Sequence, residues 1–276
     1  MQNFNPTFPF AQSSEKSSGI LHWYMLKSGS GNTLRERPTQ FSSTTNRGFT
    51  EPSEKEVFMS VNYHAFQNRG YLFSNHETLS HQWRDAFTHY DPERISRILN
   101  LKYDDNYLYL SYFQNPFRLC LENGILEKEN NGFWTDELYF NEAMTIYHLL
   151  HYTKNLPVIS GTWVPNTALP GAGAHNRNLP DPLLTPFAAK FSGKTEILAK
   201  VCKSLGGTPL TKGDVSWQFE AFPQISLQLI FWDVDEDFPA QVQVLFDSHV
   251  TDFLHFETTG CIISDLFEMI EKHAIG

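Results

Sequence analysis

The sequence predicts an α+β fold in which an antiparallel β-meander packs against helices. Apolar residues alternate with a period of two in several short runs, which is typical of strands with one buried face, and recur with a period near 3.6 in others, which is typical of helices. Short turns join neighbouring strand-like runs, which favours antiparallel pairing. A content of 41% hydrophobic and 14% aromatic residues suits a folded chain with a sizeable core.

The first 58 residues have a different composition from the rest of the chain. They contain fifteen Ser and Thr residues and little periodic apolar pattern. Such a stretch cannot bury enough apolar surface to offset the entropy lost on ordering. We therefore expect residues 1–58 to be a disordered, low-complexity N-terminal extension, and residues 59–276 to form a single α+β domain. A tail with a targeting role is the alternative for the extension.

The expected helices are marked by apolar stripes and by capping residues. Asp91 with Pro92 is a helix start, Thr135 or Asp136 is a second, and Thr258 or Thr259 is a third. Five helices are predicted, at residues 79–90, 92–99, 135–152, 187–204 and 258–270. Residues 155–186 are rich in Pro, Gly and Asn and are expected to form a long loop, a kind of segment that is often functional.

The expected strands form one hairpin and one three-stranded meander. Alternating apolar residues predict strands at residues 108–112, 117–121, 215–221, 227–231 and 242–246. Turn residues separate them at 114–116, 222–224 and 233–239.

The formal charge of −10 is concentrated near the C-terminal end. Residues 214–276 contain twelve acidic residues and one basic residue, Lys272, so this segment carries −11. Phosphate groups need Lys and Arg partners, so this segment is not expected to bind nucleic acid or anionic lipid. The apolar run at residues 20–26 is too short to span a membrane, and no membrane association is expected.

Three cysteines, Cys120, Cys202 and Cys261, lie far apart and form no Cys-x-x-Cys pair. This spacing argues against a zinc knuckle, a thioredoxin-like motif or a self-contained iron–sulfur site. Their apolar neighbours are typical of buried free thiols in a reducing compartment, so a cytoplasmic location is expected.

The densest acidic run suggests a cation site. Asp233, Asp235 and Asp237 lie at i, i+2 and i+4, a spacing that can direct carboxylate oxygens at a hard cation such as calcium or magnesium. Asp247, which ends the following strand, is a fourth candidate ligand. An EF-hand loop does not fit, because the sixth and twelfth positions would be Phe238 and Val244. For residues 233–237 a solvated turn with Asx bonds is the preferred interpretation, and for Asp247 an N-cap is an equal alternative.

Histidines and a thiol offer weaker candidates. His148 and His151 share a helix face at i, i+3, but no third metal ligand is apparent nearby in the sequence. The preferred interpretation is that they complement the dipole at the end of their helix. Cys261 with His255 would resemble a nucleophile and a base, but nothing in the local sequence indicates a lowered thiol pKa.

An ordered set of short motifs resembles a known family. The motifs are His151-Tyr152, residues 157–164, Leu169-Pro170-Gly171, Leu205-Gly206-Gly207, Gly213-Asp214, Phe222-Pro223, residues 232–240 and Leu245-Phe246-Asp247. In this order they resemble the prokaryotic domain-of-unknown-function family 3786, over about residues 78–272. The resemblance implies a cytosolic protein of anaerobic bacteria or archaea and no particular reaction. The chain departs from the family's pattern at Ala168, His175 and Pro182, in the long loop.

Three functions are compatible with these observations. The first is a non-catalytic binding or accessory protein of anaerobic metabolism, for a small molecule, cofactor or redox partner, with a pocket bordered by residues 157–182 and the aromatic strands. The second is a metal-dependent enzyme that uses the acidic carboxylates. The third is a protein-interaction module whose acidic face docks a basic partner. We expect the first, and the sequence identifies no particular cofactor.

Overall fold

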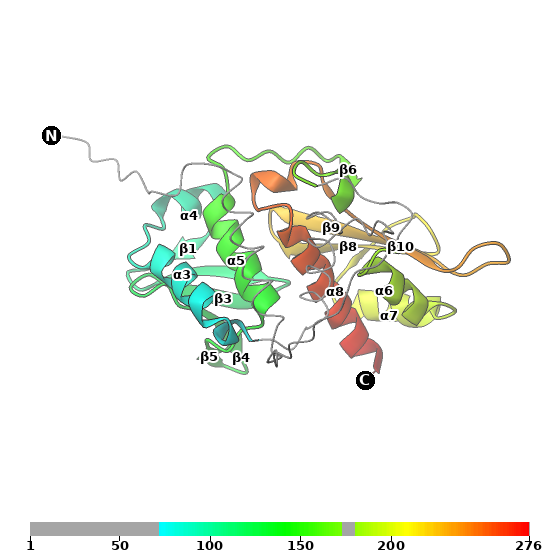
Figure 1. Ribbon diagram of the computed structural model, residues 1–276, viewed down its shortest axis with the longest axis horizontal. Helices are drawn as coiled ribbons and strands as arrows, with labels where there is room; N and C mark the ends of the chain where they lie inside the picture. Colours follow the sequence, from blue (N-terminus) through cyan, green and yellow to red (C-terminus); the bar gives the residue numbers. More distant parts are fainter. Residues whose placement is uncertain (1–71, 173–179, 276) are drawn as a thin grey trace, which may run out of the picture. The chain divides into compact units, whose positions relative to one another are not determined.

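The computed structural model describes residues 72–172 and 180–275, which lie in one compact unit, Arg69–Gly276. The extension predicted at residues 1–58 lies outside the described residues. The described part of the chain contains two antiparallel sheets and several helices, so the predicted α+β class is confirmed (Figure 1). It contains no helix that is long and apolar enough to cross a membrane.

The first sheet has its strands in the order of the sequence. These are β1 (Lys102–Tyr103), β2 (Tyr107–Tyr112), β3 (Asn115–Cys120), β4 (Leu126–Asn130) and β5 (Phe133–Thr135). The predicted hairpin is β2–β3. Its turn consists of Phe113 and Gln114, both with positive φ, which is the two-residue geometry that matches the twist of paired strands. Strands β4 and β5 were not predicted, because the residues of β4 are mostly charged or polar.

The second sheet contains the predicted meander and one unexpected strand. Its order is β6 (Trp163–Pro165), β10 (Gln241–Asp247), β9 (Ile225–Trp232), β8 (Val215–Phe222) and β7 (Thr208–Pro209). The prediction that residues 155–186 are all loop was wrong at β6, which pairs with the end of β10 from Trp163↔Asp247 to Pro165↔Leu245. Three residues are too few to show a period of two, so the sequence pattern could not reveal this strand.

Helices lie in all five predicted regions, but several boundaries differ and one predicted helix is two. They are α3 (Glu77–Phe87), α4 (Glu93–Leu99), α5 (Phe140–Tyr152), α6 (Leu184–Phe191), α7 (Thr195–Ser204) and α8 (Thr258–Ile275), with short 3₁₀ turns at Phe73–Asn75, Asn166–Ala168 and Val250–Asp252. Helix α5 begins after Thr135 and Asp136, because Thr135 ends β5 and Glu142 caps the backbone N–H of Tyr139. The helix predicted at residues 187–204 is two helices, separated at Gly193, whose φ is +70°.

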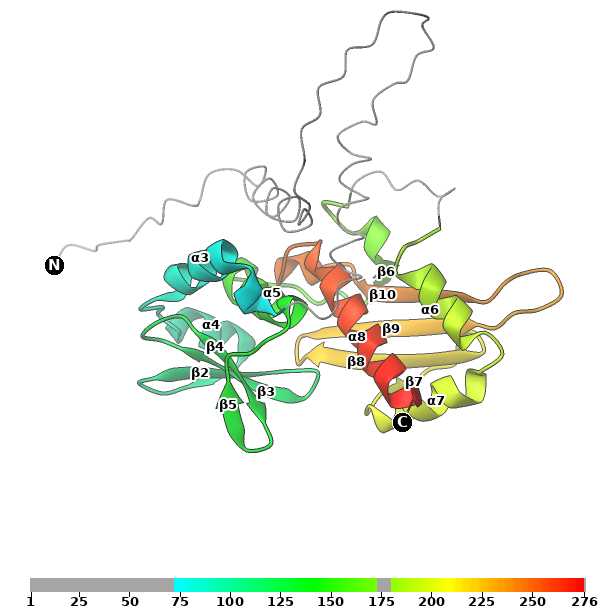
Figure 2. The same ribbon diagram turned by 60° about the horizontal axis from the view of Figure 1, so that its bottom comes forward.

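Helices α5 and α8 pack against each other at the centre of the described part. Figures 1 and 2 show them side by side, α5 on the side of the first sheet and α8 on the side of the second. The two sheets also meet directly, because Phe113 of the β2–β3 turn donates its N–H to the carbonyl of Ala221 in β8 at 2.9 Å. The rings of Tyr112 and Phe222 stack beside this bond, with centroids 5.0 Å apart.

Candidate functional site

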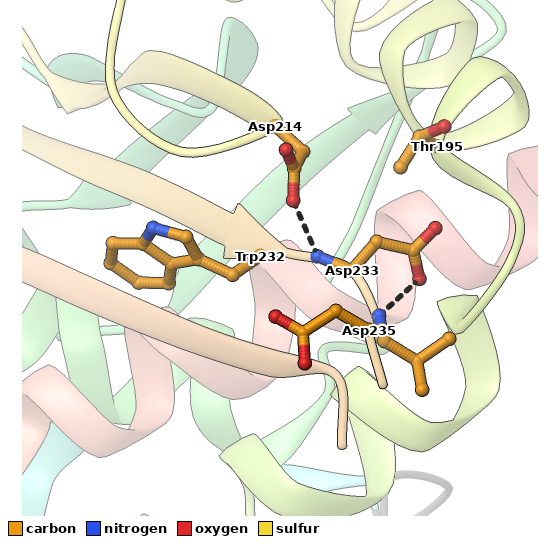
Figure 3. A pocket seen from close by; sticks show the side chains of 6 residues that line it. Thr195, Asp214, Trp232, Asp233 and Asp235 are labelled. Atoms are coloured by element: carbon orange, nitrogen blue, oxygen red, sulfur yellow. Dashed lines mark hydrogen bonds between the residues drawn. The ribbon is translucent and has the colours of Figure 1, made fainter. Parts of the chain in front are cut away.

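An open pocket of about 500 Å³ lies beside the acidic turn, residues 233–237, which follows β9. The residues that line it are Thr195, Asp214, Trp232, Asp233, Val234 and Asp235 (Figure 3). They come from the first residue of α7, the segment before β8 and the end of β9. The indole of Trp232 is 39% exposed. The pocket therefore presents three carboxylates, one hydroxyl and an aromatic ring to solvent.

Backbone contacts between β8 and β9 fix Asp214 at the pocket. Its N–H donates to the carbonyl of Phe231 at 2.9 Å, and its Oδ2 accepts the N–H of Asp233 at 2.7 Å. Gly213 allows this approach: its φ is +62°, and a Cβ there would lie 2.6 Å from the carbonyl oxygen of Phe231. A residue with a side chain would push the two strands apart at this point.

Asp233 and Asp235 are held by backbone N–H groups. Asp233 Oδ1 accepts from Gly193, between α6 and α7, at 2.7 Å and from Val234 at 2.8 Å. Asp235 Oδ1 accepts from Asp237 at 2.9 Å and from Phe238 at 2.7 Å, which is the Asx turn considered as an alternative from the sequence. Figure 3 shows the Asp233 carboxylate directed toward Thr195 and the Asp235 carboxylate directed to the side of Trp232.

Asp247 lies at the other end of the sheet from the acidic turn. Gln241 pairs with Trp232 at one end of β10, and Phe246 pairs with Leu227 at the other. At ~3.3 Å per residue, Asp247 is about 20 Å from the turn along the strand. The structure therefore does not bring all four predicted ligands together. Within residues 72–172 and 180–275, no group of three or more His, Cys, Asp or Glu side chains is placed to hold a metal ion.

Asp247 instead holds the segment that leads into β6. Its carboxylate accepts the N–H of Gly161 at 2.6 Å, the hydroxyl of Ser160 and the N–H of His249 at 2.8 Å. Burial alone would raise the pKa of Asp247, but these hydrogen bonds outweigh burial and lower it. Asp247 is not the N-cap of the 3₁₀ turn that follows, because the N-cap is His249; its bond from His249 is a local contact two residues along the chain.

A second set of polar groups lies at the α5–α8 junction, which we define as His148, His255, Glu257, Thr258 and Cys261. His148 Nδ1 lies 2.6 Å from Thr258 Oγ1, and the imidazole is 2% exposed. Burial, with smaller contributions from His255 and His151, lowers the pKa of His148 to about 3. A neutral imidazole carries no charge to complement a helix dipole, so that interpretation was wrong for His148.

The junction also contains a carboxylic acid that sequence reasoning did not single out. Glu257 Oε2 lies 3.5 Å from His255 Nδ1. Burial raises the pKa of Glu257 to about 7. Cys261 is buried, and burial, Asp265 and Glu257 together raise the pKa of its thiol well above the usual range. The thiol is therefore not an activated nucleophile, in agreement with the sequence.

Comparison with known families decides where the chain belongs. The model of a family described as Domain of unknown function (DUF3786) matches residues 91–268. The chain belongs to this family. No curated protein and no solved structure matches the chain.

Two of the motifs that carry the DUF3786 resemblance contribute residues to the acidic pocket. Gly213-Asp214 supplies one wall and Trp232 to Asp235 supply another. None of the described residues of the long loop, 157–172 and 180–182, lines this pocket. Two of the sequence motifs therefore form walls of the pocket. The sequence had instead predicted that the pocket lies beside the long loop, residues 157–182.

The sequence offered no signal for Glu257 or for Asp265, one helical turn beyond Cys261. Asp265 accepts a hydrogen bond from the Tyr112 hydroxyl at 2.7 Å, across 153 residues of sequence. Burial raises the pKa of Asp265 to about 7. An acidic residue within an amphipathic helix is normally exposed, so only the packing of α8 against its neighbours reveals these two as partly buried acids.

Proposed function

We propose that this DUF3786 protein is a non-catalytic binding or accessory protein, and that the pocket beside the acidic turn binds the cationic group of its ligand. The observation that carries the proposal is the composition of the pocket wall, which combines Asp214, Asp233 and Asp235 with the exposed Trp232. Ammonium and guanidinium groups are attracted both by carboxylates and by the face of an aromatic ring. The family resemblance extends the proposal to cytoplasmic, anaerobic metabolism.

The arrangement of the carboxylates favours an organic cation over a bare metal ion. Asp233 and Asp235 each commit an oxygen to two backbone N–H groups and point in different directions (Figure 3). A calcium ion requires six to eight oxygens around one point. A larger cation with several N–H groups can instead contact carboxylates that face different parts of one pocket. The second hypothesis, a metal-dependent enzyme, has no comparable geometric support among the described residues.

The binding site can be tested with simple cations. The purified full-length chain is titrated with arginine, spermidine and trimethylammonium compounds, with magnesium and calcium as comparison ions, by calorimetry and thermal shift. We expect an organic cation to bind, and Trp232→Ala and Asp235→Asn to weaken its binding about tenfold each. Asp105→Asn, at an exposed site outside the pocket, is the control. Absence of binding by every organic cation would contradict the proposal.

A specific feature favours the third hypothesis as a second candidate. The connection between β9 and β10 extends beyond the neighbouring strands (Figures 1 and 2). It exposes Val234 (51%) and Phe238 (62%) among its acidic residues. An exposed apolar surface surrounded by like charges is typical of a docking element for a basic, partly apolar protein segment. Affinity for basic peptides that falls steeply with salt, and that Phe238→Ser reduces, would support this candidate.

A further inference from the structure

The α5–α8 junction contains hydrogen-bonding groups that lack partners. His148 Nε2 and His255 Nδ1 are both buried and have no hydrogen-bond partner among the described residues. Buried polar atoms without partners are uncommon, because each loses its bonds to water without replacement. Two such nitrogens close together, with centroids of the two rings 6.4 Å apart, indicate that the junction has a role besides packing.

Glu257 faces one of these nitrogens. Its Oε2 lies 3.5 Å from His255 Nδ1, and the two side chains are 12% and 17% exposed. In the described part of the chain, neither Lys nor Arg lies within ion-pair distance of Glu257. An ionised carboxylate with little solvent and no fixed cation is costly. Burial accordingly raises the pKa of Glu257 and lowers that of His255.

Among residues 72–172 and 180–275, the elements packed around Glu257 supply no charge that would stabilise its ionised form. From α5, His148 contacts Thr258, and the Tyr152 ring lies 5.7 Å from that of His255. His151, also on α5, contacts Tyr152 from the side. From α8, Cys261 and Asp265 face the same region, and both favour their protonated forms.

We propose that Glu257, protonated beside His255, acts as a pH-sensitive latch that closes the first turn of α8 against α5. With the proton in place the pair is neutral and tolerates burial. When the proton leaves to water, Glu257 keeps its electron pair as a carboxylate beside His255. Hydration of that charge then requires the segment from His255 to Cys261 to open.

The direction of the pH dependence follows from linkage. The pKa of Glu257 is raised in the folded chain, from 4.5 to about 7. The stability that it contributes is therefore fully present below pH 4.5 and is lost as the pH rises through about 7. The latch is closed in mildly acidic conditions and opens above neutrality. Burial also raises the pKa of Asp265 to about 7, so both acids change charge over the same pH range. A substitution at Glu257 is therefore needed to separate its contribution from that of Asp265.

The test compares Glu257→Gln with the unchanged full-length chain between pH 5 and pH 9. Glutamine mimics the protonated acid and cannot ionise. We expect equal Tm values at pH 5 and a Tm on the order of 5 °C higher for the variant above pH 8. Glu122→Gln removes an exposed carboxylate on the β3–β4 connection and serves as the matched control. A Tm difference for Glu257→Gln that does not change with pH would overturn the latch.

A measurement on the unchanged chain keeps the proposal testable if the variant does not fold. Carboxyl ¹³C NMR follows the titration of Glu257 directly, and hydrogen exchange follows the amides of residues 258–262. We expect the titration of Glu257 to have its midpoint near pH 7. Above this pH, the amides of residues 258–262 should exchange faster than the ordinary acceleration of exchange with pH explains. A midpoint near the ordinary glutamate value, or exchange that follows only the intrinsic rate, would overturn the latch.

Discussion

Acidic side chains in two regions of this molecule have opposite environments. At the acidic turn, Asp233 and Asp235 accept hydrogen bonds from backbone N–H groups and remain open to solvent. On α8 and its N-terminal flank, Asp265 and Glu257 are partly buried, with a tyrosine hydroxyl and an imidazole as neighbours. Burial raises the pKa of both Glu257 and Asp265, so these two isolated acids within an apolar pattern link stability to pH.

The largest expected effect that separates the two regions comes from His148. Its pKa of about 3 lies below the unfolded value of 6.5, so it contributes stability above pH 6.5 that is lost as the pH falls toward 3. His148→Asn keeps a hydrogen-bonding group for Thr258 but does not titrate. Between pH 6.5 and pH 4, the chain with His148 should lose about 3 kcal/mol of unfolding free energy relative to this variant.

Urea unfolding of both proteins across this range measures the difference. His81→Asn, at an exposed position on α3, is the control and should not alter the acid dependence. If the unfolding free energy has the same pH dependence in the chain with His148 and in His148→Asn, the imidazole is hydrated. The α5–α8 junction would then not differ from the acidic turn in this respect.

A smaller effect comes from two tyrosine–aspartate bonds of equal length. Tyr112 donates to partly buried Asp265 at 2.7 Å, and Tyr109 donates to exposed Asp104 at 2.7 Å. Tyr112→Phe leaves a partly buried carboxyl group without its tyrosine donor and should cost about 1–3 kcal/mol of unfolding free energy. Tyr109→Phe should cause no measurable change, because water replaces the donor. Equal losses in chemical denaturation would contradict the burial that distinguishes the two regions.

The smallest effect distinguishes two of the predicted ligands, Asp247 and Asp237. Asp247→Ala removes an acceptor from Ser160, Gly161 and His249 and should cost about 1 kcal/mol, with faster hydrogen exchange at residues 160–163. Asp237→Ala alters a solvent-exposed side chain and should leave stability unchanged. A comparable loss at Asp237 would indicate that the acidic turn depends on its carboxylates more than their exposure suggests.

The features that could be predicted from the sequence are those that depend on near neighbours in the chain. The meander β8–β9–β10 follows from alternation over 30 residues, and the Asx turn at Asp235 follows from spacing alone. The contact of Asp233 with Gly193 and that of Tyr112 with Asp265 span 40 and 153 residues, so no local pattern reveals them. The same limit hid β4 and β5: the charged residues of β4 look solvated until the strand is paired.

The pairing of β6 with β10 has a consequence for the order in which the chain folds. Every other pair of neighbouring strands is joined by a short connection, whereas Trp163 and Asp247 are 84 residues apart in the sequence. Closing so long a loop must await contacts that form over shorter distances. We therefore expect the first sheet and the meander to form early and β6 to join last, so that the bonds from Ser160 and Gly161 to Asp247 complete the fold.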